Sequence, residues 1–292
     1  MTTALAGIRV VEMTSVVLGP YACQMLGDLG ADVIKIEPIG GDTNRNLGPH
    51  RNNSDMSALF LTCNRNKRSV SLDLKSSRGK AAAMEIIKTA DVVVHNFRPA
   101  AMERLGLDYE CVKAVNPEVI YCATYGYSKK GPYGDKGALD DSIQAASGIA
   151  MLQSMSGGEP RYLPTIIADK TTALMVVQGV LAALFHKQRS GEGQEIEVPM
   201  FESMVSFIMT EHLWGQTFEP PIGKAGYVRL MANIWLYCPI GIITGKRFAG
   251  FVREKSWPQI RVLSIWRPAY KILMNPTELL EKSFRRALGP NG

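Results

Sequence analysis

The sequence lacks the short motifs that would assign a function directly. Its 292 residues contain no P-loop, no HExxH helix and no GxSxG elbow. Gly40 and Gly41 do not make a dinucleotide-binding fingerprint, because they do not join a strand directly to a helix. The phosphate-loop, metalloprotease and serine-hydrolase classes therefore find no support in the sequence.

Cysteine is scarce and irregularly spaced. None of the five forms a CxxC pair or has a histidine at ligand spacing: Cys23, Cys63, Cys111, Cys122 and Cys238. A disulfide framework or a zinc site would need such spacing. We therefore predict reduced thiols, no metal and a cytoplasmic location.

Signals for export and for membrane insertion are missing as well. The start of the chain has no basic segment and no cleavage-site pattern, and no apolar run reaches membrane-spanning length without a polar break. With 46% hydrophobic and 21% charged residues, the composition is ordinary for a globular protein of one or two domains. We expect no membrane partner.

Acidic residues are rare in the last part of the chain. Residues 235–292 hold ten Lys and Arg against three acids, so the formal charge of +6 leaves −1 for residues 1–234. A nucleic-acid-binding domain would carry a basic face on its folded body. The sequence therefore predicts no nucleic-acid partner.

Strand and helix patterns alternate through the first two hundred residues. Strands are expected at 8–13, 33–37, 69–74, 91–94 and 119–123, and helices at 19–29, 77–89, 99–116 and 139–150, with a polar loop at 40–55. This alternation predicts an α/β fold with a mostly parallel sheet covered on both faces. Ligands bind beyond the carboxyl ends of such strands, which indicates the loops 14–20, 96–99 and 125–131.

Asp169 lies between two apolar segments, at the mouth of a helix expected to reach about His186. A carboxylate there can be an N-cap that accepts a backbone N–H. It can also be a nucleophile held in a dry site. Local sequence leaves both interpretations open.

Two further polar clusters are also ambiguous. Residues 64–69 (Asn-Arg-Asn-Lys-Arg-Ser) suit either a solvated loop or an anionic ligand such as phosphate. Residues 96–99 (Asn-Phe-Arg-Pro) suit either a strand end or a grip on an adenine and its phosphates. The four histidines are scattered (His50, His95, His186 and His212), and each is interpreted as structural or exposed.

Taken together, these segments resemble the family III CoA-transferases, which include formyl-CoA transferase and the carnitine CoA-transferases. The matching stretches run in family order between about residues 6 and 233: 7–12, 19–20, 26–38, 41–42, 64–69, 72–75, 96–99, 116–117, 126–127, 131–133, 140–148 and 191–194. The resemblance implies a Rossmann-like large domain that binds coenzyme A. It also implies an acyl-CoA substrate with a carboxylic acid acceptor, succinyl-CoA being a frequent donor, and an interlocked homodimer.

The resemblance also implies a role for Asp169, which matches the family's nucleophile. That carboxylate attacks the acyl-CoA thioester to give an aspartyl anhydride, and the CoA thiolate returns to give an aspartyl-CoA thioester. Water must be excluded, so we expect apolar surroundings from Ile166, Ile167 and Leu174. Backbone amides of a glycine-rich loop would stabilise the oxyanion.

Positions that match the family's coenzyme A path are predicted to bind the ligand here. They are Val16, Val17 and Leu18 near the thiol end, and Arg45, Leu72, Lys75, Asn96, Phe97, Arg98, Met102 and Arg104 along the nucleotide and pantetheine. For Leu72 and Met102, ordinary core packing is an equally good interpretation.

Two alternatives to transfer stay open. The same superfamily contains α-methylacyl-CoA racemases, whose Gly-His-Asp motif corresponds to Ala138-Leu139-Asp140, so that the histidine is absent here. A racemase needs two positioned acid/base groups, which favours transfer. The other alternative is an inactive or partner-dependent remnant that keeps only affinity for CoA.

The resemblance stops after Asn233. The following tail holds three of the four tryptophans, and strand and helix patterns do not alternate clearly in it. Reading its back-translation two bases out of frame permits family-like segments, from which we infer a frameshift that replaced the small domain. The predicted organisation is a large domain at 1–214, a linker at 215–233 and an atypical basic tail at 234–292.

Overall fold

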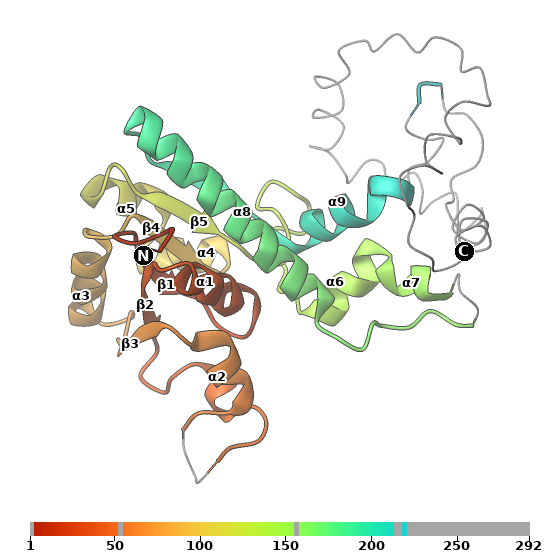
Figure 1. Ribbon diagram of the computed structural model, residues 1–292, viewed down its shortest axis with the longest axis horizontal. Coiled ribbons are helices and arrows are strands. Elements are labelled where there is room, and N and C mark those ends of the chain that lie inside the picture. The colour runs from red at the N-terminus through yellow and green to blue at the C-terminus, as the bar shows by residue number, and fades with distance from the viewer. Residues whose placement is uncertain (1–2, 52–54, 155–157, 213–217, 221–292) are drawn as a thin grey trace, which may run out of the picture. The chain divides into compact units, whose positions relative to one another are not determined.

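The computed structural model describes residues 3–51, 55–154, 158–212 and 218–220 (Figure 1). The chain divides into two units, Met1–Val205 and Ser206–Gly292. The first unit contains all six strands of the described residues. The predicted tail lies outside the described residues, as does most of the predicted linker, and both remain predictions.

The first unit is built on a six-stranded parallel sheet. The strands are β1 (Arg9–Met13), β2 (Asp32–Glu37), β3 (Lys67–Ser71), β4 (Val92–His95), β5 (Ile120–Ala123) and β6 (Gln194–Glu197). Their order across the sheet is β3-β2-β1-β4-β5-β6, and every pairing is parallel. This is the doubly wound order of dinucleotide-binding domains. In such sheets the order in which successive strands are added reverses between β1 and β4, and ligands bind at that position.

Helices lie between the strands and after the last one. They are α1 (Leu18–Asp28), α2 (Ala58–Asn64), α3 (Ser77–Ile87), α4 (Pro99–Leu105), α5 (Tyr109–Val115), α6 (Asp140–Ser147), α7 (Ile149–Ser154), α8 (Ile167–Ser190) and α9 (Met200–His212), with a 3-10 turn η1 (Thr43–Asn46). α1 packs against α8, and α8 also contacts β5 and β6. α3 contacts α5, and Figure 1 shows these two helices on one side of the first unit.

The two faces of the sheet differ in chemistry. Val11 and Met13 of β1 join a buried apolar cluster with residues of α3, α4 and α5. Glu12 lies between them in the strand, so its side chain points to the opposite face, toward α1. It is fully buried there. One face is therefore an ordinary hydrophobic core, whereas the other carries charge.

The expected α/β class is confirmed, and the differences lie at element ends. The single helix expected at 99–116 is two helices, because Gly106 adopts a left-handed φ of 60° that ends α4. Gly148, with φ 88°, likewise separates α6 from α7. The strand expected at 69–74 is wrong by two to three residues, since β3 spans Lys67–Ser71. The pattern also missed β6, α2 and α9.

α8 is long and apolar enough to cross a membrane, judged by length and composition alone. Core helices of globular proteins meet the same criterion, and α8 packs against α1, α6 and two strands. These contacts bury part of its apolar surface within the chain. It is the one such helix among the residues that the structure describes.

Candidate active site

Asp169 is the third residue of α8 and is nine-tenths buried. The N-cap interpretation is therefore wrong in its detail: Ile166 occupies the cap position and makes no side-chain cap bond. The Asp169 carboxylate lies in the first helical turn instead, where the helix dipole favours negative charge.

Burial governs the protonation of this carboxylate. The pKa of Asp169 is raised to about 7, first by loss of solvent and then by the nearby Asp140 carboxylate, while the Leu18 backbone N–H lowers it. A dry carboxylate next to a like charge is a perturbed group of the kind that catalytic sites contain.

Asp140, the first residue of α6, fixes the start of α8. Its Oδ1 atom accepts the backbone N–H of Asp169 at 3.0 Å, and its Oδ2 atom accepts Gln144 Nε2 at 2.6 Å. Gln144 Oε1 in turn accepts the N–H of Leu163 at 2.8 Å. These bonds tie α6 to the segment that leads into α8, and so they set the position of the Asp169 carboxylate.

The apolar surroundings expected around Asp169 are only partly present. Ile166 and Ile167 are half-buried, but Leu174 is 53% exposed. Five residues along a helix correspond to a rotation of about 140°, which carries Leu174 away from Asp169. Cys63 of α2 is near enough that the Asp169 charge helps to raise the pKa of its thiol, after burial as the main cause.

The loop at residues 14–18, between β1 and α1, is held from several sides. Val16 has a φ of 67°, a left-handed conformation that strains a β-branched residue. Asn96, just beyond β4, donates from Nδ2 to Ser15 O at 2.8 Å and accepts the Ser15 N–H at 3.1 Å. Asn44 Nδ2 donates to Val16 O. The loop is therefore tied to the segments that follow β2 and β4.

The predicted coenzyme A residues gather by topology at one edge. They follow the carboxyl ends of β1 (16–18), β2 (Arg45), β3 (Leu72 and Lys75) and β4 (96–98), with Met102 and Arg104 in α4. These four strands are neighbours in the sheet. Carboxyl ends of parallel strands lie along a single edge, which is where such folds bind ligands.

Val17 and Leu18 are buried, and the other nine residues fall into three groups. Phe97, Arg98, Lys75 and Arg104 are exposed, and Val16 is 39% exposed. Asn96 and Arg45 are engaged within the chain, Arg45 with Glu37 at 2.7 Å. Met102 is 1% exposed within the apolar cluster, and Leu72 packs against that cluster. For these last two, the structure favours core packing.

The basic cluster at residues 64–69 is used within the chain. Lys67 is buried and pairs with Glu12, whereas the exposed Arg65 and Arg68 pair with Asp28 and Asp32. Each of the three cations has a carboxylate partner, which favours the structural interpretation over a phosphate contact.

No metal centre is visible in the described part of the chain, where no three His, Cys, Asp or Glu side chains come together. His95 is buried, and loss of solvent lowers its pKa to about 3, so it is neutral at ordinary pH. Four of the cysteines are free thiols, and Cys238 lies outside the described residues.

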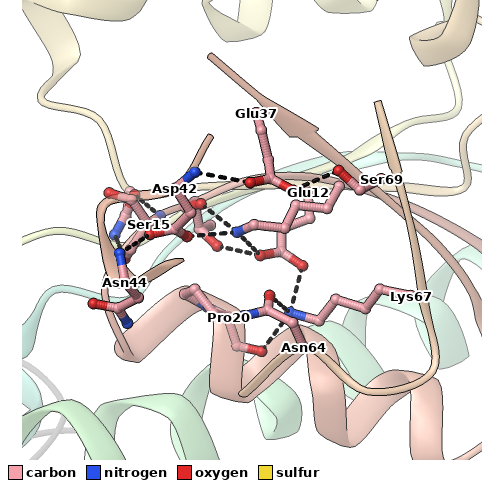
Figure 2. A network of polar contacts seen from close by, with 12 residues as sticks. Glu12, Ser15, Pro20, Glu37, Asp42, Asn44, Asn64, Lys67 and Ser69 are labelled. Carbon is pink, nitrogen blue, oxygen red and sulfur yellow. Dashed lines mark hydrogen bonds and ion pairs between the residues drawn. The ribbon is translucent and has the colours of Figure 1, made fainter. Parts of the chain in front are cut away.

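Sequence reasoning missed the site roles of Asp140 and Gln144 and the buried charges of Glu12, Lys35 and Asp42. Figure 2 shows Glu12 and Asp42. A signal for two of them was present, because Glu12 and Lys35 each lie between apolar residues within their strands. Parallel strands covered on both faces are expected to be near-continuous hydrophobic runs. Fold and site together define a doubly wound α/β protein with a desolvated carboxylate near its ligand edge.

Comparison with known proteins identifies the group. The family model described as CoA-transferase family III matches residues 5–236, and the chain belongs to this family. It is 39% identical over 215 residues to a succinate–glutarate CoA-transferase of Agrobacterium fabrum, covering 72% of this chain and 54% of the relative. A formyl-CoA:oxalate CoA-transferase of Streptomyces avermitilis is 39% identical over 207 residues, which are 70% of this chain and 50% of the relative.

Solved structures agree. A CAIB/BAIF family protein from Brucella suis superposes with a TM-score of 0.71 at 34% identity, covering 77% of this chain and 61% of that one. The fold is therefore that of the family. The chain spans about half the length of the curated relatives it matches, and the end of the match at 236 agrees with the predicted end of the resemblance near 233.

Proposed function

We propose that this chain acts in transfer of coenzyme A from an acyl-CoA to a carboxylic acid, with Asp169 as the covalent nucleophile. The observation that carries the proposal is the buried Asp169 carboxylate, with its pKa raised to about 7, beside the loop at residues 14–18. A poorly solvated carboxylate attacks a thioester more readily than a hydrated one.

The proposed course has two exchanges. The Asp169 carboxylate attacks the donor thioester carbonyl, the C–S bond breaks, and a mixed anhydride and CoA thiolate result. The thiolate attacks the aspartyl carbonyl, which releases the donor acid and leaves an aspartyl-CoA thioester. The acceptor carboxylate then repeats both steps in reverse, so that its acyl-CoA forms and the Asp169 carboxylate is restored.

The chain's own groups supply position and charge. The Leu18 backbone N–H lowers the pKa of Asp169, and a donor that favours negative charge there would also stabilise a developing oxyanion. We assign the exposed Lys75, Arg98 and Arg104 to the anionic end of coenzyme A and the half-exposed Phe97 to its adenine.

The relatives' names suggest the substrates. Succinate, glutarate and oxalate are small dicarboxylic acids. We propose an acceptor of this class, with succinyl-CoA as a donor, in the cytoplasm. We also propose that the protein forms a homodimer, as the family resemblance implies.

The half-length match favours one competing function. It is an inactive or partner-dependent remnant that binds CoA without catalysing transfer, since the match covers 54% of the relative's length. An isomerase like the racemases is the other competitor. Its acid/base pair has no evident counterpart among the described residues, since Asp140 is engaged by Asp169 N–H and Gln144.

One experiment separates the three functions. The full chain is incubated with succinyl-CoA and hydroxylamine, and the peptide that contains Asp169 is examined by mass spectrometry. An aspartyl hydroxamate that Asp169→Ala abolishes supports the transferase. CoA binding by calorimetry without hydroxamate indicates the remnant, and solvent deuterium at the substrate α-carbon indicates the isomerase.

A further inference from the structure

Four charged side chains are buried together on the α1 face of the sheet: Glu12, Lys35, Asp42 and Lys67. Two are anionic and two cationic, so the group is formally neutral. Glu12 and Lys35 are paired residues of neighbouring strands in the β1–β2 register. Figure 2 shows the group between the sheet and the start of α1.

Lys35 is the centre of this network. Its Nζ atom lies 2.9 Å from Glu12 Oε1, 2.9 Å from Asp42 Oδ2 and 2.8 Å from the backbone oxygen of Thr14. The Thr14 hydroxyl also donates to Glu12 Oε1 at 2.7 Å. All three donors of the ammonium group are thus used, one of them on the loop at 14–18.

Lys67 occupies the other side of Glu12. Its Nζ atom lies 2.8 Å from Glu12 Oε2, and it donates to Pro20 O at 2.8 Å and to Asn64 Oδ1 at 2.9 Å. These contacts reach α1 and α2 rather than residues 14–18. Lys35 and Lys67 are therefore both buried cations, but they contact different segments of the chain.

A second tether comes from the segment that follows β2. Asp42 Oδ1 accepts the Asn44 N–H at 3.0 Å, and the Asn44 side chain donates to Val16 O. Lys35 and Asn44, linked through Asp42, therefore hold two consecutive parts of a loop whose Val16 is strained. Leu18, whose backbone N–H lowers the pKa of Asp169, follows two residues later.

Stability alone does not account for this arrangement. A buried ion pair contributes little compared with well-packed apolar residues of similar volume, because both charges lose their water. Buried polar groups can instead select one conformation among several. Here the conformation selected is that of a loop which a β-branched residue disfavours.

We propose that Lys35 is a positioning residue for Asp169: held by Glu12 and Asp42, it fixes Thr14 so that the 14–18 loop directs the Leu18 N–H at the Asp169 carboxylate. Asn44 assists through Val16. The proposal rests on the proposed function insofar as it gives this contact a catalytic meaning. The geometric claim itself concerns the resting protein.

The environment of Asp169 makes the claim measurable. Asp140 faces it from α6, Cys63 from α2 and the Leu18 N–H from α1. Loss of one N–H donor to a carboxylate raises its pKa by about one unit. Lys35 acts through the loop, so its removal should shift the titration of a residue that it does not touch.

The test follows the ¹³Cγ resonance of Asp169 in the full chain as a function of pH. The resonance is assigned as the aspartate signal that Asp169→Asn removes. We expect the wild-type midpoint near pH 7, and a midpoint about one unit higher in Lys35→Met, a tenfold change in the ionisation constant. Lys67→Met is the matched control and should leave the midpoint in place.

Asn44→Ala is the second variant, because it alters no charge and keeps the buried ion pairs. A rise of the Asp169 midpoint in Asn44→Ala can come only from the loop, so it also decides the matter where Lys35→Met does not fold. An unchanged midpoint in both variants, or an equal rise in Lys67→Met, overturns the proposal.

The acylation assay then separates this inference from the proposed function. In Lys35→Met, hydroxamate formation should fall about tenfold at pH 6 and recover toward wild type at pH 9, where the carboxylate is ionised in both proteins. If wild type forms no hydroxamate while the midpoint still rises, the proposed function fails and the positioning holds. If hydroxamate forms while the midpoint stays fixed, the proposed function holds and the positioning role of Lys35 fails.

Discussion

The two faces of the sheet bury different kinds of side chain. On the side of α3, α4 and α5, Val11 and Met13 join an apolar cluster. On the side of α1, Glu12 of the same strand meets Lys35 and Lys67. Apolar burial stabilises the fold wherever it occurs. The charged face also fixes the orientation of the groups it contacts, because each ammonium group must point its donors at particular oxygens.

The largest difference between the two faces is expected when neighbouring residues of β1 are substituted. Glu12→Leu leaves two buried cations without their shared carboxylate, and we expect a loss of about 4 kcal/mol in the free energy of unfolding. Val11→Ala should lose about 2 kcal/mol by cavity formation. Urea denaturation measures both.

The same two variants test whether only the charged face of the sheet influences the 14–18 loop and, through it, the pKa of Asp169. Glu12→Leu should also raise the Asp169 midpoint, because Lys35 loses an anchor, whereas Val11→Ala should not. A shift of similar size in both variants would show that the midpoint reports general loosening rather than loop geometry.

Asp169→Asn should stabilise the protein in a defined pH window. The folded-state pKa of Asp169 is about 7, above its usual value of 3.8, because burial and Asp140 disfavour the charge. The native state therefore binds the proton more tightly, and stability is lost as pH rises from about 4 through 7. At pH 8 the variant should be more stable by about 2–4 kcal/mol, with no gain at pH 4.

Thermal unfolding at both pH values measures this effect, with Asp141→Asn, an exposed neighbour of Asp140, as the control. A gain that is equal at pH 4 and pH 8 would contradict the assigned cause. The expected pattern is that of a site residue which is held at a cost to stability.

The smallest effect concerns Val16. Asparagine tolerates a left-handed φ better than valine does, so Val16→Asn should raise the free energy of unfolding by about 1 kcal/mol. Val17→Asn, at a buried position with ordinary negative φ, is the contrasting substitution and should destabilise. Equal effects of the two would show that strain at Val16 is not the cause.

Sequence patterns predicted the sheet better than the site. The apolar runs of β4 and β5 and the alternation of strands and helices were sufficient for the α/β class. Asp169 stood out as a candidate because one carboxylate interrupts an apolar context. The partners of Asp169 could not be found, since Asp140 is 29 positions away in sequence and meets it only through the packing of α6 on α8.

The buried charges illustrate the same limit. Glu12 and Lys35 stand out in their strands, but the pairing between them depends on a register that only the assembled sheet provides. Val16 gave no signal at all, because its strained backbone is imposed by Asn44 and Asn96 from distant parts of the chain. Local preference is overruled there by tertiary contacts.

The two-way bond between Asn96 and Ser15 acts as one more rung of the β1–β4 ladder, made by a side chain where the strands have already ended. The rigidity of the sheet thereby extends into the loop at residues 14–18. A ligand that settles against this loop orders little that was not already ordered, and the entropy lost on its binding is correspondingly small.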